Sequence, residues 1–203
     1  LNINTELPEI IRLLDWERPE VIVNFAAQGN VEHSWTNPMH WLATNAIGIP
    51  NLAFNLKDKD YLKRYIQIST PEVYGICRNY REDSNYYNPS TPYAVSKVAG
   101  DLFLMAMFKK FGFPVSFIRS VNVYGIHQQL YRIIPRTIIF LKNGTRVPLH
   151  SGGRARRSFI HISDVCYGIY RVILGGKTGE AYHFSGGNTM EIKDLVKLIC
   201  RKM

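Results

Sequence analysis

The chain has 203 residues, 46% of them hydrophobic, which is enough to bury the core of one domain and excludes a disordered or fibrous protein. No apolar run reaches the roughly 18 residues of a membrane-spanning helix, so we expect no membrane partner. The net charge is +9, and from Arg119 to Lys177 ten lysines and arginines accompany a single acid, Asp164. This imbalance indicates either an anionic partner or a solvated basic face. Because no nucleic-acid-binding motif accompanies the charge, we expect a phosphorylated small molecule rather than nucleic acid.

The three cysteines, Cys77, Cys166 and Cys200, are far apart in the sequence. Their spacing is typical neither of a disulfide framework nor of metal ligands, so we expect reduced thiols and no metal site. The first residues, from Leu1 to Glu6, lack the basic and apolar segments of a signal peptide. Cytoplasmic localisation is therefore the expectation.

The first elements predict an α/β fold. Leu7 to Trp16 has helical spacing of apolar residues, and Val21 to Ala27 reads as a strand buried on both faces. A helix, a short loop and such a strand indicate part of a parallel sheet. Ala26 and Ala27 end the strand, where their small side chains would let a ligand approach the backbone. Taken alone, the two alanines are better explained by ordinary tight packing of a helix on the strand.

A long helix is predicted from Asn37-Pro38 to about Leu56. It carries more apolar residues than one core face needs, and such a helix is either buried or at an interface. These residues are Met39, Trp41, Leu42, Ile47, Leu52 and Phe54.

The next strand ends in polar residues that favour chemistry. Arg64 to Ile68 predicts a buried strand that ends at Ser69, and the hydroxyl of Thr70 and the carboxylate of Glu72 follow directly. Ligands bind at the carboxyl ends of parallel strands. Thr70 and Glu72 are therefore candidate site residues.

A helix after Ser90-Thr91-Pro92 supplies two further groups. A hydroxyl suits the cap, and proline suits the first turn. Tyr93 and Lys97 are four residues apart and lie on one helix face. Because a nearby ammonium favours phenolate, Lys97 would lower the pKa of Tyr93 and make it a tunable acid or base. Together with Thr70 and Glu72, they predict an active site.

The remaining elements continue the alternation of helices and strands. We expect a polar loop over the site, two strands and three helices, in chain order at Gly75–Pro92 (loop), Phe113–Arg119 (strand), Pro135–Leu141 (helix), Val165–Leu174 (helix capped by Asp164), Gly179–Phe184 (last strand) and Glu191–Cys200 (helix).

Two segments make the sequence recognisable. Ser69-Thr-Pro-Glu-Val-Tyr-Gly75 and Thr91-Pro-Tyr-Ala-Val-Ser-Lys97 resemble the extended short-chain dehydrogenase/reductase family, within it the NAD-dependent nucleotide-sugar epimerases and dehydratases, and closest the dTDP-glucose 4,6-dehydratases. A Tyr-x-x-x-Lys alone is weak, but its pairing with the upstream motif is specific. Arg119 to Gly125 and Arg157 to Asp164 also resemble motifs of the family, so the likeness covers essentially the whole chain.

The resemblance implies a doubly wound, Rossmann-type parallel-sheet domain in residues 1–125 and part of a small C-terminal substrate domain in residues 126–203, interleaved with it. The chain contains no Gly-x-x-Gly-x-x-Gly turn of the kind that holds a pyrophosphate, so we expect the N-terminal βαβ unit to be absent. We accordingly expect this segment alone to bind a dinucleotide poorly and to be inactive.

The resemblance also implies the site residues and partners. The catalytic residues would be Thr70, Glu72, Tyr93 and Lys97; Ala26, Ala27, Ser69, Tyr93 and Lys97 would contact NAD, with NADP not excluded; Asn122, Arg132 and Arg157 would contact a nucleotide-diphosphate sugar. The helices near residues 38–56 and 93–111 would form a homodimer.

The implied reaction is a 4,6-dehydration. Tyr93 would remove the proton of the sugar's C4 hydroxyl, and Glu72 would remove the C5 proton before water leaves from C6. Pro71 stands where these dehydratases usually carry a proton-donating aspartate, which leaves substrate and reaction type open. A 4-epimerase or glucuronate decarboxylase of the same family is one alternative, and a non-catalytic binding protein on this fold is another.

Overall fold

The computed structural model describes residues 1–75, 81–84 and 86–203. The predicted loop at Gly75–Pro92 thus lies partly outside the described residues, as does Cys77. The chain forms two interleaved units, Leu1–Arg119 with Ile169–His183 and Ser120–Gly168 with Phe184–Met203. The chain thus leaves the first unit at Arg119 and returns to it at Ile169. The predicted division into residues 1–125 and 126–203 stays a prediction, as do the roles assigned to the two parts.

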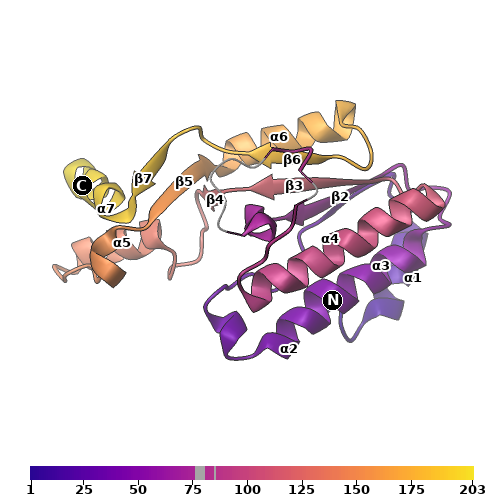
Figure 1. Ribbon diagram of the computed structural model, residues 1–203, viewed down its shortest axis with the longest axis horizontal. Helices are drawn as coiled ribbons and strands as arrows, with labels where there is room; N and C mark the ends of the chain where they lie inside the picture. The colour runs from indigo at the N-terminus through magenta and orange to yellow at the C-terminus, as the bar shows by residue number, and fades with distance from the viewer. Residues whose placement is uncertain (76–80, 85) are drawn as a thin grey trace. The chain divides into compact units, whose positions relative to one another are not determined.

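The first unit is built on a four-stranded sheet with the strand order β1-β2-β3-β6 (Figure 1). The strands are Val21–Asn24, Arg64–Ser69, Val115–Ser120 and Ala181–Phe184. β1 pairs in parallel with β2, and β2 in parallel with β3, with Ser69 opposite Arg119 at the carboxyl ends. The predicted α/β, Rossmann-type fold with a parallel sheet is confirmed.

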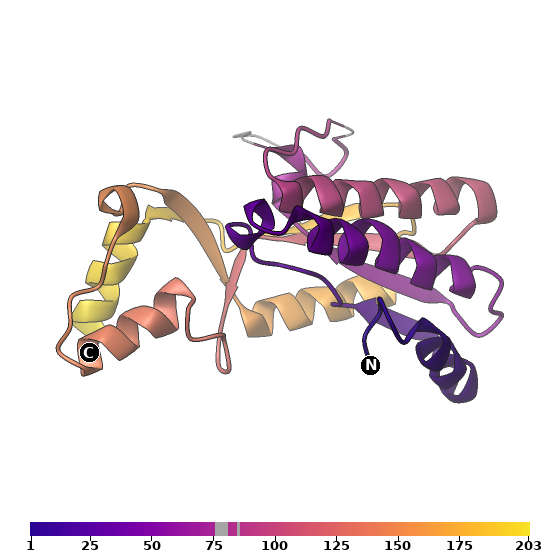
Figure 2. The same cartoon turned by 90° about the horizontal axis from the view of Figure 1, so that it is seen from below.

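Two long helical segments lie side by side on one face of this sheet (Figures 1 and 2). The helix predicted from Asn37 is continuous but mixed, and consists of α2 (Pro38–Trp41), the π-helical η2 (Leu42–Gly48) and α3 (Ile49–Leu56). Its neighbour α4 spans Pro92–Phe111. Their inner faces meet the sheet in a core that includes Ile49, Leu56, Tyr65, Leu104 and Phe117. The helix α1 (Leu7–Glu17) packs against α3.

Among the residues that the structure describes, the first strand is less buried than predicted. Val21 is 36% exposed, and Ile22 and Val23 are only partly buried. β1 stands first in the strand order and pairs with β2 on one side. A short apolar run is compatible with either a central or an edge position, so the sequence pattern does not reveal the difference.

The second unit has a smaller sheet. β4 (Asn122–Tyr124) pairs in parallel with β5 (Arg156–His161), which pairs antiparallel with β7 (Thr189–Glu191). The helices α5 (Ile133–Lys142) and α7 (Ile192–Lys202) pack together. β6 is therefore not the last strand as predicted, since the three residues of β7 are too few to show an alternating pattern.

The helix α6 (Ile162–Gly175) begins earlier than expected. Asp164 lies inside its first turn and is not the cap, although a carboxylate there still complements the helix dipole. None of the helices in the described ranges is both long and apolar enough to cross a membrane.

Candidate active site

The carboxyl end of β2 turns directly into the short 3-10 helix η3 (Pro71–Tyr74). Thr70 is extended and caps this helix, because its Oγ1 accepts the backbone N–H of Glu72 at 3.3 Å. Proline at the first helical position lacks only an N–H that would have no helical partner. Thr70 is 7% exposed, and its hydroxyl hydrogen remains available as a donor.

The helix α4 begins as the sequence predicts, with a hydroxyl cap and a proline in its first turn. Thr91 Oγ1 accepts the backbone N–H of Ala94 at 3.1 Å. Tyr93 in the first turn is partly buried, and Lys97 one turn later is 3% exposed. The Lys97 ammonium donates to the carbonyl oxygen of Ile68 at 2.7 Å. Lys97 thereby connects α4 to the last residues of β2.

The environment of Lys97 disfavours its charge. Burial lowers the pKa of the ammonium, while the negative charge of Asp101 one turn further along α4 opposes that shift. η3 also packs on α4, through Val73 and Tyr74 against Val98. The structure thus places Thr70 and Glu72, and Tyr93 and Lys97, at one end of β2.

A chain of hydrogen bonds ties the loop after β1 to this end of α4. The side chain of Asn45, in the π-helical turn, accepts from the backbone N–H of Gln28 and donates to its carbonyl, both at 3.0 Å. Asn45 also donates to Ser96 Oγ at 3.0 Å, and Ser96 donates to the Tyr93 carbonyl at 2.7 Å. π-helical turns are frequent at functional sites. This one holds the backbone next to Ala27, which is exposed together with Ala26.

Ser69 points into the protein interior. It is 7% exposed, and its hydroxyl donates to Asp101 Oδ2 at 2.6 Å. The same carboxylate oxygen lies 3.3 Å from Arg119 Nη2, and both side chains of this ion pair are almost fully buried. Burial raises the pKa of Asp101, and the positive charges of Arg119 and Lys97 oppose the shift. The Ser69 hydroxyl is therefore already bonded to Asp101. The predicted contact of Ser69 with a cofactor stays a prediction and involves other atoms of the residue.

Sequence reasoning missed this buried ion pair. Asp101 continues the helix face of Tyr93 and Lys97 at a spacing of four, which is the one signal that points to it. Arg119 ends β3 and lies opposite Ser69 in the strand register. That neighbourhood depends on strand pairing, which no local pattern reveals.

The predicted substrate contacts all belong to the second unit. Asn122 donates to the Ser158 carbonyl at 3.2 Å, and Arg157 donates to the Arg156 carbonyl at 2.9 Å. The guanidinium of Arg132 lies 5.3 Å from the ring centre of Tyr131. Asn122, Arg132 and Arg157 are exposed and present polar groups to solvent.

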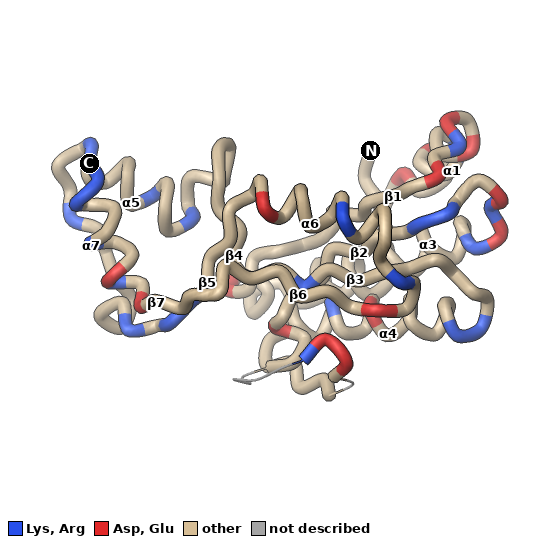
Figure 3. Tube along the Cα trace, turned by 90° about the horizontal axis from the view of Figure 1, so that it is seen from above, with Lys and Arg blue, Asp and Glu red and all other residues tan. Residues whose placement is uncertain are grey.

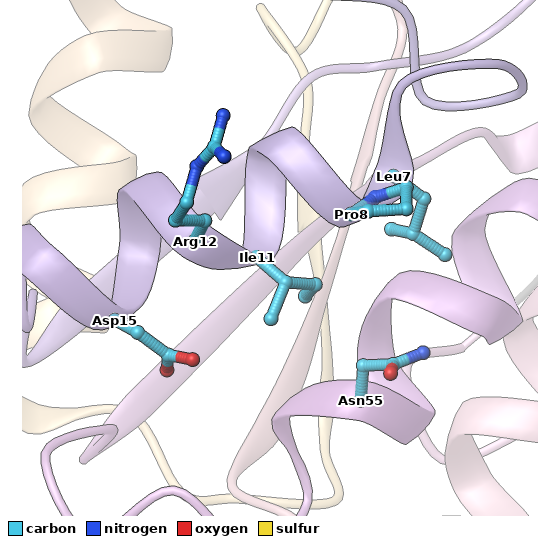
Figure 4. A pocket seen from close by; sticks show the side chains of 6 residues that line it. All are labelled: Leu7, Pro8, Ile11, Arg12, Asp15 and Asn55. Carbon is cyan, nitrogen blue, oxygen red and sulfur yellow. The ribbon is translucent and has the colours of Figure 1, made fainter.

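Two hollows lie on the first unit. One, of about 450 Å³, lies between α1 and α3 and is lined by Leu7, Pro8, Ile11, Arg12, Asp15 and Asn55 (Figure 4). Asp15 is already bonded to Lys59 at 2.8 Å and Tyr61 at 3.0 Å, and no predicted site residue lines this hollow. The other, of about 430 Å³, lies at the start of α4 and is lined by Trp35, Leu42, Pro89, Ser90, Thr91, Pro92 and Val95. No predicted site residue lines the second hollow either, although Thr91 and Pro92, which start α4, do.

Comparisons with known proteins show the family of the chain. Residues 4–184 match the sequence profile described as "NAD dependent epimerase/dehydratase family". The chain is 35% identical over 183 residues to a dTDP-glucose 4,6-dehydratase of Streptomyces niveus, covering 90% of this chain and 54% of that protein. It is 30% identical over 192 residues to the human dTDP-D-glucose 4,6-dehydratase, covering 92% of this chain and 55% of the relative. The chain thus spans a little over half the length of these relatives.

Solved structures share the fold. A dTDP-glucose 4,6-dehydratase from Streptomyces venezuelae, crystallised with NAD, superposes with a TM-score of 0.89 at 31% identity, covering 99% of this chain and 62% of that one. A UDP-glucose 4-epimerase from Thermotoga maritima reaches a TM-score of 0.91 at 23% identity, covering 99% of this chain and 66% of that one. The latter likeness concerns the fold alone.

Proposed function

Because the chain belongs to the NAD dependent epimerase/dehydratase family, we propose that it carries the catalytic centre of a nucleotide-sugar 4,6-dehydratase. One observation carries the proposal. Lys97 of α4 is buried and bonded to the carbonyl of Ile68 at the end of β2, with Tyr93 one turn earlier and Glu72 on the adjoining η3. An acid or base of adjustable pKa and a carboxylate are the two groups that this reaction needs.

The residues of the first unit fit a nicotinamide cofactor. The exposed Ala26 and Ala27 follow a parallel strand, carry nothing larger than a methyl group and are followed by a backbone segment that Asn45 holds in place. Ala26, Ala27 and Lys97 would hold NAD there, beside Tyr93. When bound, NAD would accept the hydride from C4 and return it to C6. Several dehydratases of similar structure contain NAD.

The first proton transfer belongs to Tyr93. As the base for the C4 hydroxyl it must ionise near neutral pH, and the Lys97 ammonium favours its phenolate. Thr70 Oγ1 already accepts the N–H of Glu72, so its own hydrogen can be donated to the same sugar oxygen. Thr70 thereby orients the hydroxyl that Tyr93 deprotonates.

The second proton transfer belongs to Glu72. A ketone at C4 makes the C5 proton acidic, and a carboxylate on η3 is the base that removes it. Pro71 has no proton to donate to the departing C6 hydroxyl. We therefore assign that role as well to Glu72, which has just acquired the C5 proton.

The second unit is suited to an anionic substrate. It contains eleven lysines and arginines but three acids, and Figure 3 shows the basic residues along α5, α7 and the strands beside them. Arg157 and Arg132 can hold phosphate oxygens through charge-assisted hydrogen bonds, and Asn122 supplies an uncharged donor. Because relatives act on dTDP-glucose, this is the first substrate to test.

The test uses the protein in its natural length, dTDP-glucose and heavy water. The expected product is a 4-keto-6-deoxy sugar with deuterium at C5, detected by mass spectrometry. Glu72→Gln should abolish the deuterium uptake, while Glu32→Gln, an exposed residue of the same unit, should retain it. A screen of uridine-, guanosine- and cytidine-diphosphate sugars follows if dTDP-glucose is inert, and failure of all four classes contradicts the proposal.

Pro71 favours one alternative, a 4-epimerase or glucuronate decarboxylase that shares the C4 oxidation. The same experiment separates these reactions, since an epimerised or decarboxylated sugar retains its C6 oxygen or loses carbon dioxide. A non-catalytic binding protein, the remaining alternative, would bind nucleotide sugars without changing them. Cytoplasmic localisation stays a prediction.

We further infer a homodimer through the outer faces of the two helical segments on the sheet. The large apolar residues exposed there are Met39, Ile47, Phe54, Val95, Leu102, Phe103 and Phe111, each at least 40% exposed. Such a set indicates an interaction surface, whereas Trp41 and Leu52, also counted in the predicted excess, belong to the core. Ile47→Glu combined with Phe103→Glu should yield a monomer in sedimentation; a parent protein that is itself monomeric at micromolar concentration contradicts the homodimer.

A further inference from the structure

Stability alone does not explain why the chain buries the Asp101–Arg119 pair. Taking two charges out of water costs several kcal/mol each, and such pairs are often replaceable by apolar residues without loss. Arg119 is 2% exposed and lies at the carboxyl end of β3, opposite Ser69 of β2. What it contacts there suggests a function.

Arg119 contacts two tyrosines, Tyr74 of η3 and Tyr87, which lies shortly before α4. It donates through Nη1 to the hydroxyl of Tyr74 and through Nη2 to the hydroxyl of Tyr87 at 3.2 Å. Its guanidinium carbon lies 4.9 Å from the ring centre of Tyr74 and 5.4 Å from that of Tyr87. The two rings are stacked, 6.1 Å apart and 8° from parallel. Arg119 thus binds both rings by charge and by cation–π contact.

Tyr74 carries the network further, to His183 of β6. Because a guanidinium has no acceptor, the Tyr74 oxygen accepts from Arg119. The same hydroxyl shares a second hydrogen bond with His183 Nε2 at 2.8 Å, in which the His183 tautomer sets the donor. Burial lowers the pKa of His183, which favours its neutral ring. The backbone N–H of His183 in turn donates to Glu82 Oε1 at 2.6 Å.

Backbone contacts also join η3 to the residues just before α4. The Asn88 N–H donates to the Val73 carbonyl at 3.1 Å. Gly75 has φ of +73°, and a Cβ on it would meet the Asn88 carbonyl oxygen at 1.9 Å, so only glycine fits. η3, which carries Glu72, and the residues just before α4, which carries Tyr93, are therefore joined to each other and to Arg119.

We propose that Arg119, neutralised by Asp101, is a positioning group that acts through Tyr74 to hold Glu72 where it removes the C5 proton. Tyr74 is two residues after Glu72 in η3 and is 1% exposed. Arg119 thereby connects the two proton-transfer groups, Glu72 and Tyr93, without touching the substrate. This inference rests on the proposed dehydration. Small displacements of a base are costly, since a shift of about 1 Å can lower a rate about 100-fold.

The test compares Tyr74→Phe with Tyr86→Phe in the protein of natural length, with NAD and substrate. Tyr74→Phe keeps the ring but removes the oxygen that Arg119 and His183 share. Tyr86 is 65% exposed in the same loop, so Tyr86→Phe is the matched control. We expect Tyr74→Phe to lower kcat about tenfold or more with KM near the parent value, and Tyr86→Phe to leave both unchanged.

An isotope effect distinguishes positioning from general loosening. With substrate that carries deuterium at C5, misplacement of Glu72 makes C5 deprotonation more rate-limiting, so the isotope effect on kcat rises in Tyr74→Phe. A purely structural loss reduces the number of active molecules and leaves the isotope effect as in the parent. Unchanged turnover, or slower turnover with an unchanged isotope effect, overturns the proposal.

Two additions keep the test decisive. If Tyr74→Phe does not fold, as judged by thermal unfolding, Tyr87→Phe removes the second hydroxyl at a less buried position and is expected to raise the isotope effect in the same way. Amide hydrogen exchange across residues 81–91 should be faster in the variants than in Tyr86→Phe. If the parent makes no 4-keto-6-deoxy sugar, the proposed function fails. If amide exchange is equally fast in Tyr74→Phe and Tyr86→Phe, Tyr74 does not hold these residues in place, whatever the reaction is.

Discussion

The two units differ in their balance of basic and acidic residues and in whether charged side chains are buried. The first has fourteen basic and thirteen acidic residues, and among those that the structure describes it buries three charged side chains, Lys97, Asp101 and Arg119. The second has eleven basic and three acidic residues, and all of its lysines and arginines are exposed or half-buried. Buried charge is costly and shifts pKa values, which suits proton transfer, whereas exposed charge of one sign attracts an anion. This difference is consistent with the proposal that the chemistry belongs to the first unit and substrate binding to the second.

Removal of the Tyr93 hydroxyl should have the largest effect. Tyr93→Phe deletes the proposed base for the C4 hydroxyl, and general acid–base catalysis contributes about 10²–10⁴-fold to a rate. We expect turnover of dTDP-glucose to fall by that factor with little change in thermal stability. Tyr170→Phe, at an exposed position of the same unit, should match the parent. Full activity of Tyr93→Phe would contradict the assignment of Tyr93 as the base and, with it, the placement of the chemistry in the first unit.

The buried ion pair should be far more sensitive than an exposed one. Asp101→Asn leaves Arg119 buried without its counter-charge, and loss of one partner of a buried pair costs about 3–5 kcal/mol of unfolding free energy. Asp60→Asn breaks the exposed pair of Asp60 with Arg18 and should change the denaturation midpoint hardly at all. Urea unfolding of both variants measures the contrast. If both variants lose the same unfolding free energy, burial does not make the Asp101–Arg119 pair more important for stability than the exposed Asp60–Arg18 pair.

Lys97 should cost stability while it supports activity. Lys97→Met should lower turnover about 100-fold, because the phenolate of Tyr93 loses its nearby cation. The same change removes a buried charge, so the unfolding free energy at neutral pH should equal or exceed that of the parent.

The destabilisation by the Lys97 ammonium should depend on pH. Burial lowers the pKa of Lys97 in the folded protein below the unfolded value of about 10.4. Between these two values the unfolded chain binds more protons, so the stability of the parent rises with pH. The advantage of Lys97→Met is therefore greatest below the folded pKa and shrinks as pH approaches the unfolded one. A pH-independent difference between the two proteins would contradict the buried ammonium.

The exposed arginines of the second unit should give the smallest effect. Arg157→Gln removes the proposed charge-assisted bond to the substrate diphosphate, and we expect KM to rise about tenfold with kcat unchanged. The rise should diminish at high salt, because exposed charges are screened. Arg146→Gln, also exposed in this unit, is the control. A fall in kcat at constant KM would instead place Arg157 in the chemistry.

Local sequence determined the parts of the site that lie within one element. Thr91 and Pro92 start α4 because a hydroxyl and a proline satisfy the needs of a helix N-terminus. Tyr93 and Lys97 then share a face by helix geometry alone, and the apolar run before Ser69 forms β2. The parallel sheet followed from the alternation of such elements.

Only the tertiary structure decided what surrounds these residues. Asp101 and Arg119 lie on a helix and a strand, and Ser69 joins them because β2 pairs with β3 in one particular register. The edge position of β1 and the short β7 likewise depend on which strands become neighbours. The physical reason is range: capping and helical spacing act over a few residues and are visible in the sequence. Burial and charge pairing depend instead on contacts between segments that are far apart along the chain.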